Sequence, residues 1–294
     1  MISKVGTNFS DSAYSYGSIA WSYNNLGEIY KLKEDKSLAN LYYENAVKYG
    51  NLDPEQHNNR AWFLELYLKN HTEALKSIDK SIELDNQNPK WQLYKAKILL
   101  HSNDISNAEN YFIDAVEKSN KSQNYISELA NFYSVIGKYS KADKLFNEVL
   151  KSDSVIALVY HQKTEHLIRQ NKMDDAIIIA NNGITKFKND TVSFEQLGRI
   201  FMSKKEYFKA LKAYESGLAI MEFNEAHRNI EDGVLQVYSS DVCLKIYEIY
   251  TILNETALAC EMLNRAEGHA QIETRPDNLI IQEKIKSLKL SCPN

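Results

Sequence analysis

The chain has 294 residues, of which 44% are apolar and 25% charged, and its formal net charge is −4. This balance is that of a folded globular protein, and the negative charge gives no general attraction to nucleic acid or to an anionic membrane. The 4 prolines and 10 glycines are too few for the many turns of a β-sandwich or barrel.

The three cysteines, Cys243, Cys260 and Cys292, are odd in number and widely spaced. This usage is typical of a reducing compartment and predicts no disulfide framework. We expect Cys243 and Cys260 to be buried structural thiols, because both fall on apolar or nearly apolar helix positions. The N-terminus has no apolar signal-peptide core, and no segment reaches the ~18 apolar residues of a membrane span. We therefore expect a cytoplasmic protein, although a trimmed signal peptide is compatible with the sequence. Its Lys-, Asn- and Ile-rich composition suggests a bacterial source.

Residues 1–18 are rich in Ser and Tyr, and we expect them to lead into a first helix that begins near Ile19. From residue 19 to residue 221 the sequence repeats. An alanine that follows a short polar loop recurs at separations of 35, 34, 34, 34 and 34 residues. These anchors are Ala39, Ala74, Ala108, Ala142, Ala176 and Ala210. A fixed period of this size indicates a stack of six similar units.

Each unit predicts a helical hairpin. In the fourth unit, Ile126, Leu129 and Tyr133 follow the spacing of one helix face, and Ala142 and Phe146 repeat it after a Gly-containing turn. Small residues at the anchors, and twelve positions before most of them, let the two helices approach closely. One hairpin does not bury its own apolar face, so stacking creates the core.

Beyond residue 221 the period breaks. Residues 222–240 predict an insertion that extends the preceding helix and adds a loop around Asp232 and Gly233. Residues 241–268 match a seventh, degenerate hairpin, whose anchor Ala259 lies 49 residues after Ala210. Residues 269–294 predict a last amphipathic helix, starting near Pro276, that caps the final hairpin.

This pattern resembles the tetratricopeptide repeat family. The small residues that match the family's pattern are Gly27, Ala39, Ala46, Ala130, Ala142, Gly198, Ala210 and Gly217. The proline that the family often carries between units is mostly missing, and only Pro54 and Pro89 fall near such places. The resemblance implies an all-α fold, a right-handed superhelical solenoid of about seven helical hairpins with a C-terminal capping helix.

The sequence contains no catalytic motif. It has no P-loop, no dinucleotide-binding glycine motif and no nucleophile elbow. His161 and Glu165 lie four apart on an expected helix and His166 follows, but no third metal ligand or nucleophile accompanies them. We therefore expect no enzyme activity, no metal and no cofactor.

Tyrosine occurs 19 times, which is compatible with base stacking on single-stranded nucleic acid. However, Tyr30, Tyr43, Tyr133 and Tyr214 are explained as core residues between repeats. With the acidic net charge, this explanation leads us to expect no nucleic-acid partner.

The resemblance implies that the first helix of each hairpin lines a concave groove. The residues that we expect there are Asn24, Glu28, Lys90, Leu93, Lys97, Ser127, Asn131, His161, Glu165, Arg169, Glu195 and Arg199. Ser127 and Asn131 in particular are expected to face outward. A row of polar groups suits an extended peptide or a helix, and a merely solvent-facing row is the other interpretation.

One subset of the family grips the C-terminal carboxylate of its partner with Lys and Asn from successive first helices. Asn24 and Glu28 stand where that clamp has Lys and Asn, and Glu28 would repel a carboxylate. We therefore expect no adaptor of that subset.

The sequence thus predicts a non-enzymatic scaffold or adaptor that binds a peptide or protein segment in the groove. The alternative is a peptide-responsive regulatory sensor, like the bacterial regulators built on this repeat, in which a peptide changes the shape of the superhelix. Those regulators often carry an extra N-terminal bundle or DNA-binding helix-turn-helix, and repeats that begin near Ile19 leave no room for one. We expect no membrane partner, and the end faces of a solenoid can pair to form oligomers.

Overall fold

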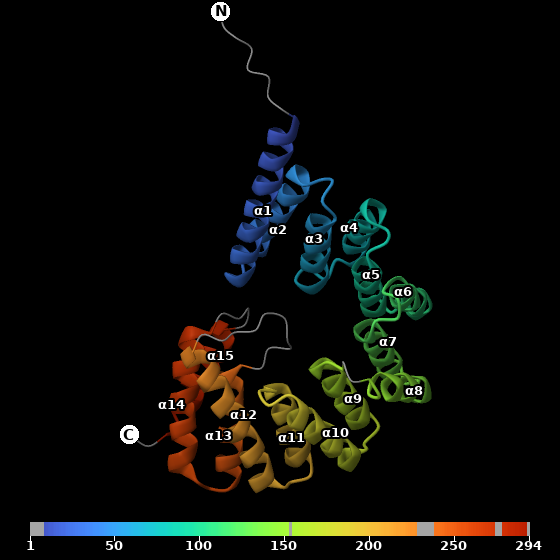
Figure 1. Cartoon of the computed structure of the whole chain (residues 1–294). Helices are drawn as coiled ribbons and strands as arrows, with labels where there is room; N and C mark the ends of the chain where they lie inside the picture. The colour runs from blue at the N-terminus through green and yellow to red at the C-terminus, as the bar shows by residue number, and fades with distance from the viewer. Residues whose placement is uncertain (1–8, 153–154, 228–237, 274–277, 293–294) are drawn as a thin grey trace, which may run out of the picture. The chain divides into compact units, whose positions relative to one another are not determined.

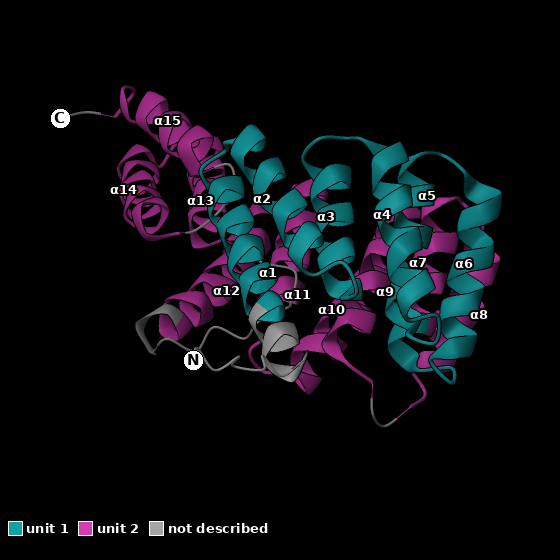
Figure 2. Ribbon diagram, turned by 90° about the horizontal axis from the view of Figure 1, so that it is seen from above, with its two compact units in different colours: residues 1–125 teal, residues 126–294 magenta. Residues whose placement is uncertain are grey.

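The computed structural model describes residues 9–152, 155–227, 238–273 and 278–292. Within these ranges it contains fifteen α-helices and no strand, which confirms the all-α prediction (Figure 1). None of the described helices combines the length and the apolar character that crossing a membrane requires. The chain forms two compact units, residues 1–125 and 126–294, and the boundary falls within α7, Gln123–Val135 (Figure 2).

Unit 1 consists of three helical hairpins. The two helices of each hairpin pack on each other, and the second helix then packs on the first helix of the next hairpin, α2 on α3 and α4 on α5. The helices are α1 (Phe9–Leu32), α2 (Lys36–Tyr49), α3 (Pro54–Leu66), α4 (His71–Leu84), α5 (Pro89–His101) and α6 (Ile105–Lys118).

Unit 2 continues the same arrangement. In it α9 pairs with α10, α11 with α12 and α13 with α14, and the last helix, α15, packs on α14. Its helices after α7 are α8 (Tyr139–Val149), α9 (Ala157–Arg169), α10 (Met173–Lys186), α11 (Thr191–Ser203), α12 (Tyr207–His227), α13 (Ser239–Ile252), α14 (Thr256–Ile272) and α15 (Asn278–Lys289).

Local turn chemistry explains where these helices begin and end. Several first helices are followed by a residue in the left-handed region, such as Glu34 (φ 59°) and Asn103 (φ 64°). After each of these two residues comes an aspartate whose carboxylate caps the second helix: Asp35 accepts from the Leu38 N–H, and Asp104 accepts from the Asn107 N–H at the start of α6. The polar loops of the repeat are therefore helix stop and start signals.

The anchors of the repeat lie in the core. The anchor alanines at 39, 74, 108, 142, 176 and 210 are all fully buried. A Cβ added to Gly198 would lie 2.4 Å from the Tyr214 ring, and one added to Gly27 would lie 3.0 Å from the Tyr43 ring. The first helix needs a small residue there because an aromatic ring of the second helix lies against its backbone.

The N-terminal boundary differs from the prediction, because α1 begins at Phe9 rather than near Ile19. The extended part of the helix carries Tyr16, whose ring stacks on Tyr49 of α2 at a centroid distance of 6.4 Å. Tyr23 also stacks on Tyr49, at a centroid distance of 5.4 Å. The contact of Tyr16 lies before the first repeat position, so the period did not reveal it.

The start of the expected insertion, residues 222–240, continues α12 as far as His227. Glu222 there accepts hydrogen bonds from Arg265 (2.6 Å) and His269 (3.1 Å) of α14. These bonds fasten the last hairpin to α12. The expected loop around Asp232 and Gly233 lies outside the described residues.

The cysteine prediction is wrong for one pair. Cys260 on α14 and Cys292, just after α15, form a disulfide across 32 residues of sequence, so Cys260 is not a thiol. The two residues meet because α15 folds back along α14, which their spacing does not show. Cys243 is a buried thiol, as expected. Disulfides persist in oxidising compartments, so cysteine usage does not support the expected cytoplasmic location.

Candidate functional site

The first helices of successive hairpins lie side by side within each unit, α1 beside α3 and α9 beside α11. We call the surface formed by α1, α3 and α5 the first-helix face of unit 1, and that formed by α9, α11 and α13 the first-helix face of unit 2. All twelve predicted groove residues lie on first helices. The period brings equivalent positions of neighbouring helices together, so their side chains can bond to one another.

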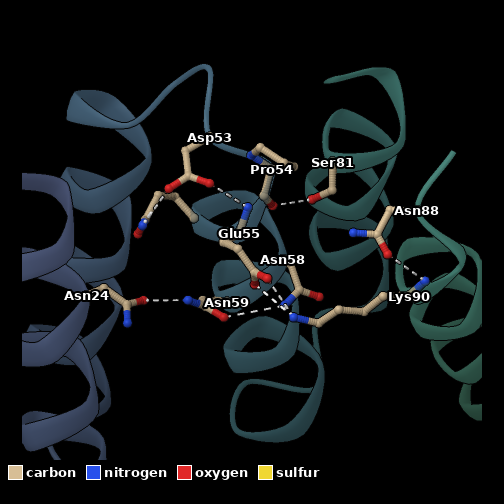
Figure 3. A network of polar contacts seen from close by, with 10 residues as sticks. Asn24, Asp53, Pro54, Glu55, Asn58, Asn59, Ser81, Asn88 and Lys90 are labelled. Carbon is tan, nitrogen blue, oxygen red and sulfur yellow. Dashed lines mark hydrogen bonds and ion pairs between the residues drawn. The ribbon is translucent and has the colours of Figure 1, made fainter. Parts of the chain in front are cut away.

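On the first-helix face of unit 1, amides and charges bridge the helices (Figure 3). The Asn59 amide donates to Asn24 Oδ1 at 3.0 Å, across 35 residues of sequence. The Lys90 ammonium donates to both carboxylate oxygens of Glu55, at 2.7 and 3.0 Å, also across 35 residues. Asn58, next to Asn59, is buried, and its Oδ1 has no hydrogen-bond partner among the described residues.

The same face carries an aromatic corner that the sequence analysis missed. Trp62 of α3 and Tyr94 of α5 meet edge to face, with ring centroids 5.0 Å apart and planes inclined by 74°. Both side chains are half-buried, so each leaves part of its ring at the surface. The Lys90 ammonium lies 5.6 Å from the centre of the Tyr94 ring. Trp62 comes three residues after Asn59 and Tyr94 four after Lys90, and this helical spacing was the signal available in the sequence.

Where α3 and α5 end, a buried carboxylate joins three helices of unit 1. Glu65 of α3 bonds to His71 Nδ1 at 2.6 Å and to His101 Nδ1 at 2.9 Å. The two imidazoles are partly exposed, whereas the Glu65 side chain is buried. Among the described residues no group of His, Cys, Asp or Glu is placed to hold a metal ion.

On the first-helix face of unit 2, charges neutralise one another. Arg199 of α11 donates to both oxygens of Glu165 on α9, at 2.9 and 3.1 Å, and lies 3.6 Å from Glu195. The Gln196 amide also donates to Glu165, at 2.9 Å. Burial alone would lower the pKa of the Arg199 guanidinium, but the bond to Glu165 and the charge of Glu195 hold that pKa above its usual value. Burial raises the pKa of Glu195.

His161 belongs to a buried cluster. Its Nε2 lies 2.6 Å from Asp190 Oδ1, and the Ser193 hydroxyl donates to Asp190 Oδ2 at 2.5 Å. Burial alone would raise the pKa of Asp190, but the bonds from His161 and Ser193 hold it below its usual value. Ser193 bonds to the aspartate and not to the histidine, and all three residues are buried. The cluster therefore lacks the serine–histidine contact and the access that nucleophilic catalysis requires.

Three predicted groove residues do not face outward. Leu93, Ser127 and His161 are buried, and for Ser127 the expectation of an outward-facing side chain is wrong. They occupy the repeat position that meets the next first helix, as the contact of Gln196 with the His161 carbonyl at 3.0 Å shows. Helical periodicity places this position between neighbouring first helices, where solvent is excluded.

The other predicted groove residues retain some exposure. Glu28 is ion-paired with Lys31 and accepts a hydrogen bond from the Tyr43 hydroxyl. Arg169 is exposed and reaches Ser134 at 3.4 Å. Asn131 and Lys97 are half-buried. The predicted residues are thus divided between the two units, and several of them are engaged in contacts between helices.

No protein-family model matches the sequence, and no curated protein matches it. Solved structures do share its fold. The chain is similar to a tetratricopeptide repeat protein from Parabacteroides merdae, with a TM-score of 0.54 and 13% identity over 94% of this chain and 99% of that chain. It is also similar to PilW, a type IV pilus biogenesis factor, with a TM-score of 0.53 and 15% identity over 77% of this chain and 98% of that chain. Its similarity to yeast Tom70 has a TM-score of 0.54 and 15% identity over 99% of this chain and 67% of that chain. The fold is that of a tetratricopeptide repeat protein.

Proposed function

We propose that the protein is a non-catalytic scaffold and that the first-helix face of unit 1 binds a peptide or protein segment. The aromatic corner of Trp62 and Tyr94 carries the proposal. Aromatic side chains that are partly exposed beside amide and ammonium donors are typical of binding hot spots, because a partner buries the rings and bonds to the donors. Lys90, Asn59 and Asn24 supply those donors from three successive first helices.

The first-helix face of unit 2 is less suited to this role. Arg199 is bonded to both carboxylate oxygens of Glu165, as Lys90 is to Glu55 in unit 1, but it also lies 3.6 Å from a second carboxylate, that of Glu195. A partner of Arg199 would therefore have to replace two ionic contacts. Separating Arg199 from its carboxylates would cost free energy, and a contact with the partner would have to regain that free energy before it could add to the affinity.

Peptide selection tests the proposal. A random peptide library is panned against the full chain, and the selected peptides are titrated into variants by calorimetry. Trp62→Ala is expected to weaken binding at least tenfold, because it removes the aromatic corner. Arg199→Ala, on the first-helix face of unit 2, is the matched control and should leave the affinity within twofold. Selected peptides that bind both variants equally would contradict the proposal.

The regulatory sensor remains a separate interpretation of the same groove. It predicts that a saturating peptide changes the radius of gyration measured by small-angle scattering. A scaffold that binds through a preformed face predicts an unchanged radius, so this measurement separates the two functions.

A further inference from the structure

The outward flank of α1 carries a stripe of three apolar residues and one serine with heptad spacing. Ile19, Ser22, Leu26 and Ile29 are separated by three, four and three residues, the spacing of coiled-coil contact positions. Ile19 is 38% exposed and Ile29 is 44% exposed. Leu26 between them is half-buried. We call these four residues the α1 stripe.

In other hairpins the equivalent positions are covered. Ile29 corresponds in the repeat to Phe63 on α3 and to His166 on α9. Phe63 packs on Tyr43 of the preceding hairpin at a ring distance of 4.8 Å, and His166 packs on Phe146 of the preceding hairpin at 5.4 Å. Both are buried. The α1 stripe is therefore the interhairpin interface continued onto the first hairpin, where no described helix covers it.

The position of Leu26 supports this reading. In the second and third hairpins the equivalent residues are Arg60 and Lys95, which pair with Glu44 (3.3 Å) and Asp79 (2.6 Å) of the preceding hairpin. In the first hairpin a leucine stands in place of these charged residues. A charged residue at the position of Leu26 would suit a flank that contacts only solvent. An apolar residue there suits a flank that packs on another helix.

We infer that the α1 stripe binds the α1 stripe of a second copy of this chain. A heptad stripe is self-complementary, since two copies can interleave the same residues about a two-fold axis. At the other end of the chain, α15 packs on α14 through the buried Ile285, and the Cys260–Cys292 disulfide joins the two segments. Pairing about a two-fold axis uses the same stripe on both copies, so pairing through α1 ends at two copies.

Light scattering with size-exclusion chromatography and sedimentation equilibrium test the inference. The wild-type chain should have twice its monomer mass of 33.9 kDa at micromolar concentration. The double variant Ile19→Glu, Ile29→Glu places like charges on both stripes and should raise the dimer dissociation constant at least tenfold. Leu41→Glu, at an exposed leucine on α2 outside the stripe, is the matched control and should remain dimeric.

Circular dichroism on the double variant separates loss of pairing from loss of folding. The double variant should keep the helical signal of the wild type, because both isoleucines are exposed in the single chain. A wild-type chain that is monomeric at high micromolar concentration would overturn the inference. So would a dimer that Leu41→Glu weakens as much as the double variant. This test does not involve the proposed peptide-binding face, so the two proposals stand or fall separately.

Discussion

The first-helix faces of the two units use the same repeat positions in different ways. In unit 1 they carry amides, the Lys90–Glu55 ion pair and an edge-to-face pair of aromatic rings, and the rings remain partly exposed. In unit 2 they carry Glu165 and Arg199, which bond through two oxygens and are satisfied without a partner. The repeat geometry determines which positions of neighbouring helices are in contact. The residue types at those positions determine whether side chains remain exposed for a partner to bind.

The units also differ in how they are held together. Unit 2 contains the buried His161–Asp190–Ser193 cluster and the disulfide. Unit 1 contains all three tryptophans, Trp21, Trp62 and Trp91. Tryptophan fluorescence therefore reports on unit 1 alone, whereas far-UV circular dichroism reports on both units. This difference in probes lets each perturbation below be assigned to one unit.

The largest effect is expected from Asp190→Ala. The substitution leaves His161 and Ser193 without their partner in a buried site and removes the cap of α11, at a cost of about 3 to 5 kcal/mol. Urea unfolding followed by circular dichroism should show the loss, with the tryptophan transition shifted much less. Asp174→Ala is the control, since that side chain is 86% exposed, and its transition should not move. Equal effects of the two variants would contradict the buried cluster.

Reduction of the disulfide should rank second. In the chain-entropy account, opening a loop of 32 residues gives the unfolded chain more freedom and lowers the free energy of unfolding by about 3 to 4 kcal/mol. The Cys260→Ser, Cys292→Ser variant should unfold earlier by circular dichroism while tryptophan fluorescence keeps its midpoint. Intact mass under non-reducing conditions checks the bond itself. A wild-type mass with three free thiols would show that the bond does not form.

Glycine at one repeat position should matter more in unit 2 than in unit 1. A Cβ on Gly198 would lie 2.4 Å from the Tyr214 ring, against 3.0 Å between Gly27 and the Tyr43 ring. Gly198→Ala should therefore cost about 1 to 3 kcal/mol, and Gly27→Ala less. Gly268→Ala is the control, because nothing lies within 4 Å of its added Cβ, and that variant should be neutral or slightly more stable. Thermal unfolding measures all three, and a reversed order would refute the assigned helix contacts.

As the pH falls, unit 2 should lose stability before unit 1, and this effect should be smaller than those of the substitutions above. Burial lowers the pKa of His166, so the stability that its neutral form contributes is present above about pH 6.5 and is lost as the pH falls below that value. Burial alone would raise the pKa of Asp143, but Lys163 and His166 hold it below its usual value. Its contribution is complete above about pH 3.9 and is lost at lower pH. In an acid titration, the circular dichroism signal should therefore begin to fall at a higher pH than the pH at which the tryptophan fluorescence of unit 1 changes.

His166→Phe sharpens this prediction. Phenylalanine stands at the equivalent position of other hairpins, as Phe63 and Phe132, and both are buried. The variant should keep the fold and lose the pH dependence of stability between about pH 6.5 and 5, because the titrating group is gone. An unchanged pH profile would show that His166 does not set it.

The sequence predicted the hairpins well because small residues at a fixed period have one physical meaning. Ala39 and Ala142 are fully buried where the period places them. The candidate site was less predictable. Ser127 looks like a surface residue, yet it is buried where two first helices meet. Trp62 reads as core from its hydrophobicity, yet it borders the surface beside Tyr94. The disulfide between Cys260 of the last hairpin and Cys292 after α15 lies outside the repeat, so the period does not indicate it.

The central claim is that binding takes place on the first-helix face of unit 1. Hydrogen exchange with mass spectrometry, on the full chain with and without a selected peptide, tests it most directly. The account predicts slowed exchange in peptides from α1, α3 and α5, with α9, α11 and α13 unchanged. Protection confined to α9, α11 and α13 would contradict it.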